Sequence, residues 1–280
     1  MLVEWWERHW KMLLFVPSLM FVLSLAYFAY NTANTDFPVP RSVELSGGKE
    51  ITISYAGLDR QGFEKAAERL GLDYRFVGEN TLIVDGKYTM NETLVLQELG
   101  KHMQVLDSSL RTVGPSLGEA FWCQAETAML VSLVFISIMV FFLFKSFVPS
   151  FAVISSIIID VSVTTAIVTA MGYDFSIAMI GALLTIVSYS IDTDVLLTTK
   201  LVKHGGNFRE NMKSALKTGF IISLAAMISA VTVFVVSANP VLKDISIVLI
   251  VGLVVDFIVT WLQNAGIMKW WANERTGKGN

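Results

Sequence analysis

Four aspartates lie inside long apolar stretches of the sequence, where a carboxyl group is least expected. They are Asp160, Asp192, Asp194 and Asp256. On insertion scales an aspartate at the centre of a membrane-spanning helix costs about 2.5–3.5 kcal/mol. An apolar site disfavours the charged form of a carboxyl group, and a carboxyl group that changes between its neutral and charged forms carries a proton. The four aspartates are therefore predicted to couple ion movement to work, on a polar path inside a helical bundle.

Polar neighbours at helical spacing strengthen this interpretation. Ser156 and Thr164 stand four residues before and after Asp160, so the three share one helix face. The other polar residues expected to support the aspartates are Ser188, Tyr189, Ser190, Thr193, Lys200, Thr260 and Gln263. Such stripes belong against other helices or water rather than lipid. The alternative is purely structural, because hydrogen bonds between membrane helices are common and contribute about 0.6 kcal/mol on average.

The pair Asp192 and Asp194 cannot both face one narrow cavity on a regular helix. Two positions are separated by about 200° around the axis. Ser188 and Lys200 fall near the face of Asp192, whereas Ser190 and Thr198 stand four residues from Asp194. The face argument slightly favours Asp192 as the functional carboxylate, and both residues remain candidates.

Composition places the chain among integral membrane proteins. Of its 280 residues, 54% are hydrophobic and 16% charged, the mean hydropathy is +0.58, and the net charge is −3. The slightly negative charge argues against nucleic acid as a partner. Cys123 is the single cysteine and excludes an internal disulfide. The scattered histidines, the lack of a Gly-rich phosphate loop and the lack of a nucleophile–His–acid set predict no metal, no cofactor and no enzymatic activity.

The apolar segments predict six membrane-spanning helices between two cytoplasmic ends, 1–11 and 269–280. A bilayer core requires about 20 apolar residues for each helix. The predicted helices cover residues 12–30, 125–144, 147–171, 175–199, 218–238 and 243–268. The first segment is either a signal peptide or an uncleaved anchor. Its length, with Glu4 and Glu7 in the leader, favours the anchor.

Basic residues predict the orientation, because Lys and Arg are retained on the inner side of a membrane. With the N-terminus inside, the inner segments hold Arg8, Lys11, Lys145, Lys200, Lys203, Arg209, Lys213, Lys217, Lys269, Arg275 and Lys278. The short outer loops hold only Lys243. The chain is therefore expected in the cell membrane, in contact with the lipid bilayer, with both termini cytoplasmic and segment 31–124 outside.

Segment 31–124 carries the signals of an α+β domain. Apolar residues at helical spacing predict helices, and short β-rich runs between turn residues predict strands. The expected elements are a strand or hairpin at 43–55 with Gly47 and Gly48 at its turn, a helix at 59–70, strands at 73–77 and 81–84 with a turn at 78–80, a helix at 91–103, and a strand at 104–112. The order β-α-β-β-α-β is the ferredoxin-like arrangement.

Four local patterns resemble the SecF family, the smaller subunit of the SecD–SecF protein-export complex, in its archaeal branch. Leu45-Ser46-Gly47-Gly48 is similar to the Gly-Gly signature that opens the family's external domain, and Val113-Gly114-Pro115-Ser116-Leu117-Gly118 to its V-G-P-x-x-G. Asp160-Val161 resembles the Asp-Val of the third helix, and Tyr189-Ser190-Ile191-Asp192-Thr193-Asp194 the Y-S stretch of the fourth. Their order and spacing cover nearly the whole chain.

This resemblance implies a resistance-nodulation-division-like half-unit of six helices that pairs with a SecD-like subunit. It also implies that a proton or sodium gradient powers the external domains, which help to draw a translocating polypeptide out of the Sec translocation channel. The sequence departs from the bacterial pattern Y-S-L-N-D-T, whose Asp aligns with Thr193. The resemblance therefore leaves Asp192 and Asp194 as equal alternatives.

Two other functions are compatible with the sequence. One is a small-molecule or lipid exporter of the resistance-nodulation-division type, for which the external domain is small. The other is a passive scaffold of the translocon. Gly114 and Pro115 join the external domain to the second helix. They are expected to form either a hinge or a simple turn.

Overall fold

The computed structural model describes residues 2–35, 37–78, 80–202 and 208–277, which form two compact units. The first unit comprises residues 1–39, 128–173 and 178–280, and it is a helical bundle. The second comprises residues 40–127 and 174–177, and it contains a β-sheet. Glu79, in the expected turn at 78–80, and the basic residues Lys203 and Lys278 lie outside the described residues.

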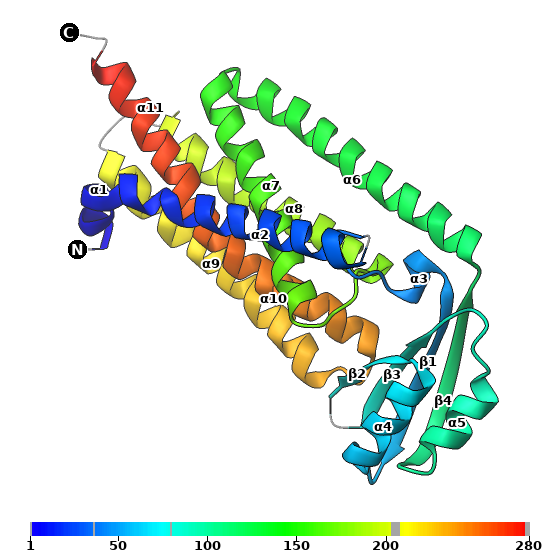
Figure 1. The fold of residues 1–280 in the computed structure, drawn as a ribbon. Helices are drawn as coiled ribbons and strands as arrows, with labels where there is room; N and C mark the ends of the chain where they lie inside the picture. Colours follow the sequence, from blue (N-terminus) through cyan, green and yellow to red (C-terminus); the bar gives the residue numbers. More distant parts are fainter. Residues whose placement is uncertain (1, 36, 79, 203–207, 278–280) are drawn as a thin grey trace. The chain divides into compact units, whose positions relative to one another are not determined.

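Six helices among the described residues are long and apolar enough to cross a membrane (Figure 1). They are α2 (Phe15–Thr35), α6 (Pro115–Phe144), α7 (Phe147–Ala170), α8 (Ile177–Val202), α9 (Phe208–Val236), and a last run made of α10 (Pro240–Val259), the π-helical turn η1 (Thr260–Asn264) and α11 (Ala265–Gly277). The predicted fold class of a six-helix membrane protein is confirmed. The expected cytoplasmic N-terminus is itself a helix, α1 (Leu2–Leu13).

The bundle has a buried set and an exposed set of spanning helices. In α7, α8 and the α10 run, 61%, 50% and 50% of the apolar window is buried, against 11% in α2, 11% in α6 and 17% in α9. The buried set carries the membrane aspartates. Helices α8 and α10 approach closely because Gly252 of α10 lies against Ile186 of α8, in space that a side chain would occupy.

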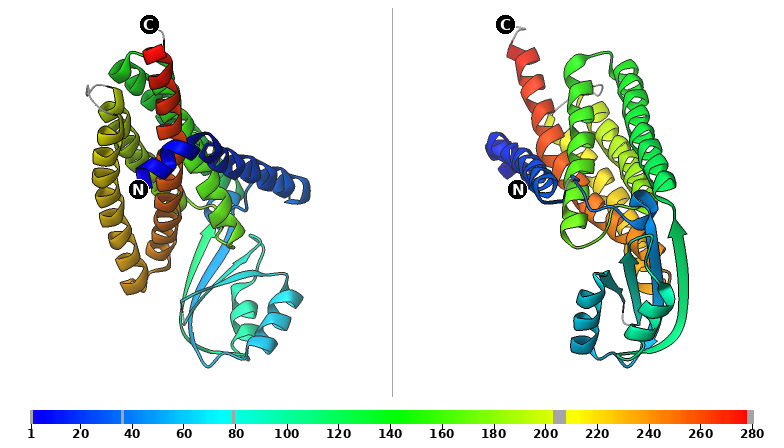
Figure 2. Two further views of the ribbon diagram at one scale, coloured as in Figure 1. Left: turned by 90° about the vertical axis from the view of Figure 1, so that its left-hand side faces the viewer. Right: turned by 45° about the vertical axis from the view of Figure 1, so that its right-hand side comes forward.

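The second unit is the predicted α+β domain. Its elements are α3 (Val43–Ser46), β1 (Gly48–Ala56), α4 (Arg60–Leu70), β2 (Asp73–Val77), β3 (Thr81–Gly86), α5 (Glu92–Leu99) and β4 (Gln104–Val113). The strands pair antiparallel in the order β2-β3-β1-β4, the ferredoxin-like arrangement. Helices α4 and α5 cover one face of the sheet (Figure 2). They bury Phe63 and Leu99 against Ile51, Ile53 and Leu82, each at most 1% exposed.

The expected strand or hairpin at 43–55 is wrong in its first part. The carbonyl of Ser42 accepts hydrogen bonds from the amides of Leu45 and Ser46, which closes the helical turn α3. Gly47 follows with φ +76°, a conformation that favours glycine, and a Cβ there would lie 2.6 Å from Cα of Pro115. Gly47 therefore ends a helix instead of forming a hairpin turn, and β1 starts at Gly48.

Several helix ends differ from the expected bounds. Helix α6 starts at Pro115, ten residues before the expected start at 125, because proline is well placed at the first position of a helix. The carbonyl of Gly114 accepts the amides of Leu117 and Gly118. Helix α5 stops at Leu99, before Gly100, instead of reaching 103. Apolar residues alone set the expected bounds, so the polar first turns of α6 and α9 fell outside them.

Candidate functional site

Three of the four membrane aspartates converge in the interior of the bundle. Asp160 of α7 and Asp194 of α8 are 0% exposed, and Asp256 of α10 is 1% exposed. They lie close enough for the charge of one carboxylate to act on the others. We call Asp160, Asp194 and Asp256 the carboxyl cluster. Because each comes from a different helix, a change of charge in the cluster acts on the packing of three helices.

Hydroxyl groups connect the cluster to neighbouring helices. Ser190 of α8 donates a hydrogen bond to Oδ2 of Asp160 at 2.7 Å. Thr260 Oγ1 lies 2.8 Å from Oδ1 of Asp194 and 3.3 Å from Oδ1 of Asp256. A hydroxyl has one hydrogen to donate and two lone pairs that accept. Thr260 can therefore serve either carboxyl group, and it can accept a proton from one side while giving its own to the other.

Thr193, the residue that aligns with the bacterial aspartate, faces the cluster as well. It is 2% exposed, and its hydroxyl lies 3.3 Å from Oδ2 of Asp256. The same hydroxyl is 3.1 Å from the carbonyl of Ser190. Thr193 thus occupies the space between α8 and α10, while Asp194, the next residue, supplies the carboxyl group.

A residue that the sequence did not single out, Asn264, is part of the site. Its side-chain amide donates to Oδ1 of Asp194 at 2.8 Å, and the residue is fully buried. On an uninterrupted α-helix, position 263 returns to the face of Asp256 after about two turns. The π-helical turn η1 contains one extra residue, which moves Asn264 into that place and turns Gln263 toward Ser155 of α7, at 3.1 Å.

Several buried polar atoms of the site find no hydrogen-bond partner in the described part of the chain. They are Oδ1 of Asp160, Oδ2 of Asp194, the hydroxyls of Thr164 and Thr198, Oε1 of Gln263 and Oδ1 of Asn264. Buried polar groups are nearly always hydrogen-bonded, and each exception calls for an explanation. These acceptor oxygens, which have no partner among the described side chains, are suited to a site that takes up and releases a proton.

The preference for Asp192 over Asp194 is not supported by the geometry. Asp192 is exposed on the outer side of α8, and so is Ser188. Tyr189 is half-buried. Lys200 does not reach the cluster, because its ammonium group donates to Ser214 and Thr218 of α9. By contrast, Ser156, Thr164, Ser190, Thr193, Thr260 and Gln263 are all buried with Asp160, Asp194 and Asp256.

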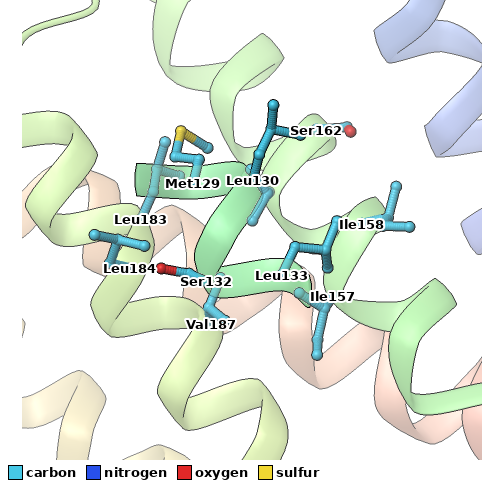
Figure 3. Close-up of a pocket in the computed structure, with 11 residues that line it drawn as sticks. Met129, Leu130, Ser132, Leu133, Ile157, Ile158, Ser162, Leu183, Leu184 and Val187 are labelled. Atoms are coloured by element: carbon cyan, nitrogen blue, oxygen red, sulfur yellow. The ribbon is translucent and has the colours of Figure 1, made fainter. Parts of the chain in front are cut away.

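An apolar groove in the same unit is separate from this chemistry. It has a volume of about 190 Å³ and is lined by α6, α7 and α8, with Leu133, Ile157 and Val187 among its residues (Figure 3). Its polar side chains are Ser132 and Ser162, and no member of the carboxyl cluster lines it. Within the described ranges, no group of three or more His, Cys, Asp or Glu side chains is arranged to hold a metal ion.

These features define a polytopic helical membrane protein with a ferredoxin-like domain between its first and second spanning helices. Residues 93–274 match the family described as "Protein export membrane protein SecD/SecF, C-terminal". The chain belongs to this SecD/SecF family of protein-export membrane proteins.

Its curated relatives include archaeal SecF proteins. It is 32% identical to the protein-export membrane protein SecF of Methanolacinia petrolearia over 272 residues, which cover 94% of each chain. It is also 32% identical to SecF of Methanothermobacter thermautotrophicus, covering 96% of this chain and 95% of the relative. The match over nearly the full length agrees with the resemblance of the sequence motifs.

Two solved structures share the fold. One is SecDF, a translocon-associated membrane protein from Thermus thermophilus, with a TM-score of 0.76 and 23% identity. The other is SecDF in a super-membrane-facing form, with a TM-score of 0.62 and 22% identity. The similarity covers 95% and 94% of this chain and 38% of each SecDF chain. The chain thus spans well under half the length of these structures.

Proposed function

We propose that the chain is an accessory subunit of the protein-export machinery that couples an ion gradient to the translocation of polypeptides. The observation that carries this proposal is the carboxyl cluster, three buried aspartates on three helices with unused acceptor oxygens. Intramembrane ionisable residues mark ion pathways and proton relays. The role in protein export is inferred from membership of the SecD/SecF family.

The cluster supports coupling because its charge state and its helix contacts depend on each other. An ionised carboxyl group in this site requires donors such as Ser190, Thr260 and Asn264. Loss or gain of a proton therefore changes which of these contacts is favourable. Moving one charge through 100 mV supplies about 2.3 kcal/mol. Two or three ions supply enough to shift a helix packing that differs by a few kcal/mol.

The proposal includes a second membrane subunit and a fixed orientation. The exposed set α2, α6 and α9 presents apolar side chains to lipid or to partner helices. The relatives named SecDF contain a second segment of greater length, which favours pairing with a SecD-like subunit. Both termini are proposed to be cytoplasmic, and the ferredoxin-like domain to lie outside, where the translocating polypeptide leaves the Sec channel.

The test is export of a secretory polypeptide into vesicles that contain the channel, a SecD-like subunit and this chain. Gradient-dependent export should fall at least tenfold in each of Asp160→Asn, Asp194→Asn and Asp256→Asn. Asp192→Asn, two residues from Asp194 and exposed, is the matched control and should retain export. Collapse of the proton gradient or the sodium gradient alone identifies the coupled ion.

Other outcomes would favour the alternatives. A passive scaffold predicts that export depends on the presence of the chain but not on the gradient or on the three aspartates. An exporter of lipids or small molecules predicts gradient-driven activity without the translocon. Failure of a SecD-like chain to copurify would argue against the half-unit arrangement.

A further inference from the structure

The helix α1 packs onto the segment that supplies donors to the carboxyl cluster. Trp6 and Trp261 are 6% and 5% exposed, and both belong to an apolar cluster with Leu197 and Ala265. The indole N–H of Trp6 donates to the backbone carbonyl of Trp261 at 3.0 Å. Trp261 is the second residue of the π-helical turn η1. The N-terminal helix α1 is thereby hydrogen-bonded to the backbone of η1.

The turn η1 itself carries two hydrogen-bond donors of Asp194. Thr260 and Asn264, the first and last residues of η1, each place a donor 2.8 Å from Oδ1 of Asp194. In η1 the amide of Ala265 bonds to the carbonyl of Thr260, five residues back. A π-turn interrupts the α-helical hydrogen-bond ladder. The Trp6 indole adds a hydrogen bond to this turn from outside the helix.

Whereas α1 contacts the backbone of Trp261, the side chain of Trp261 packs against α9. A Cβ on Gly219 of α9 would lie 2.6 Å from the indole of Trp261, so the ring packs against α9 in space that a larger residue at position 219 would fill. Phe257 and Trp261 have ring centroids 6.1 Å apart. The turn is therefore clamped between α9 and α1, and Trp6 contributes the hydrogen bond to that clamp.

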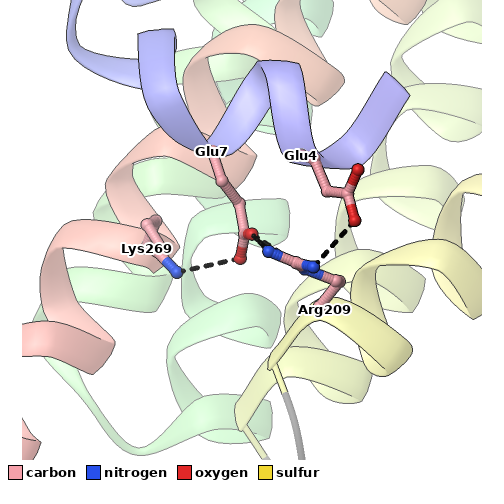
Figure 4. A network of polar contacts seen from close by, with 4 residues as sticks. All are labelled: Glu4, Glu7, Arg209 and Lys269. Carbon is pink, nitrogen blue, oxygen red and sulfur yellow. Dashed lines mark hydrogen bonds and ion pairs between the residues drawn. The ribbon is translucent and has the colours of Figure 1, made fainter. Parts of the chain in front are cut away.

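Ionic contacts fix α1 in the position that this bond requires. Glu7 accepts from Arg209 of α9 at 2.7 Å and from Lys269 of α11 at 3.2 Å, and Arg209 also bonds Glu4 at 2.9 Å (Figure 4). Burial acts to raise the pKa of Glu7, yet the hydrogen bonds from Arg209 and Lys269 hold that pKa below its ordinary value. Glu7 is thus charged at neutral pH and joins the starts of α9 and α11.

We infer that Trp6 is a positioning residue of the ion-coupling site, which acts through the carbonyl of Trp261 to hold Thr260 and Asn264 on Asp194. This inference rests on the proposed function of the carboxyl cluster. The opposite side of α1 is exposed, since Trp5 and Met12 there are 56% and 69% exposed. The hydrogen bond from Trp6 to the carbonyl of Trp261 is therefore a route by which a displacement of α1 reaches Asp194.

The test compares Trp6→Phe, which keeps an aromatic ring and removes the N–H, with Trp5→Phe on the exposed side of the same helix. The first readout is the infrared band of the protonated Asp194 carboxyl group, assigned with Asp194→Asn and followed over pH in the purified full chain. The carboxyl groups that face Asp194 are Asp256 of α10 and Asp160 of α7. Their bands are assigned with Asp256→Asn and Asp160→Asn.

We expect Trp6→Phe to move the titration midpoint of the Asp194 band by about half a pH unit, the equivalent of one net hydrogen bond. Trp5→Phe should leave the midpoint unchanged. Arg209→Gln, which removes the ion pairs of α1 with α9, should move the same midpoint in the same direction as Trp6→Phe. Gradient-driven export should fall about threefold in Trp6→Phe.

The spectroscopic and export readouts separate the two claims. A midpoint that is the same in wild type and a folded Trp6→Phe overturns the positioning role, whatever export does. A midpoint that moves in Trp6→Phe and Arg209→Gln supports it, even if Asp194→Asn leaves export intact and the proposed function fails. Equal movement in Trp5→Phe would show that the effect does not depend on the Trp6 hydrogen bond and would overturn the inference.

Discussion

The side chain of Asp85 makes the stability of the ferredoxin-like domain depend on pH. Asp85 lies in β3, where its neighbours in register are Glu50 of β1 and Asp73 of β2. Burial, followed by the charges of Glu50 and Asp174, raises the pKa of Asp85 from 3.8 to about 7, and Arg75 opposes this. Its Oδ1 has no hydrogen-bond partner among the described residues.

The direction of the pH effect follows from the protonation of Asp85 in the folded and the unfolded chain. Between pH 4 and 7 the folded domain keeps the proton of Asp85, whereas the unfolded chain releases it. The stability that the protonated Asp85 contributes is therefore fully present below about pH 4 and is lost as pH rises through about 7. A pKa change from 3.8 to about 7 corresponds to about 4 kcal/mol at most. In Asp85→Asn the side chain stays neutral at every pH. The free energy of unfolding of the variant, relative to wild type, should therefore increase by about 3 kcal/mol between pH 5 and 8.

Amide hydrogen exchange in the full chain measures this difference. Wild type and Asp85→Asn are compared at the same pH, so the intrinsic exchange rate cancels. At pH 8 the amides of β1 and β3 should exchange at least tenfold more slowly in the variant, and at pH 5 the difference should be much smaller. Asp107→Asn, exposed on β4, is the control. An identical ratio of rates at both pH values would refute the argument.

Three further predictions concern turns and helix ends. In a thermal unfolding assay, Gly47→Ala should lower the stability of the second unit by about 2 kcal/mol or more, because φ is +76° and the new Cβ would clash with Pro115. Gly57→Ala is the control: φ is +61° but the space around it is open, so it should cost about 1 kcal/mol. Asn239→Ala should cost about 1 kcal/mol by removing the cap on the amide of Val241, and Asn239→Ser should not. Gly114→Ala meets no atom within 4 Å, so it should fold normally and slow export by stiffening the joint; unchanged export would identify a simple turn.

Much of the fold was predictable because it depends on strong local signals. The six apolar runs are long enough to identify the spanning helices. The α+β domain follows from the alternation of short apolar strands with helical spacing, and Gly71 ends α4 in the left-handed conformation. The turn α3 was not predictable in this way, because Val43 and Leu45 alternate like a strand while Ser42 closes the turn.

The site was predictable in its carboxyl groups and less so in its details. Asp160 and Asp256 each have no second carboxyl group within ten residues in the sequence, so there was no choice to make between neighbouring carboxylates. Helix α8 carries polar residues on both sides, so spacing alone did not separate Asp192 from Asp194. The contribution of Asn264 depends on the extra residue in η1, and α-helical periodicity cannot reveal that insertion.

Ion flux in proteoliposomes tests the central claim most directly, because it does not require a passenger polypeptide. The complex of this chain with a SecD-like subunit is reconstituted with pH-sensitive and sodium-sensitive dyes inside, and a gradient is imposed. We predict a flux of protons or sodium that disappears in Asp194→Asn and persists in Asp192→Asn. Equal flux in wild type, Asp194→Asn and Asp192→Asn would contradict the assignment of the buried carboxyl cluster as the ion-coupling site.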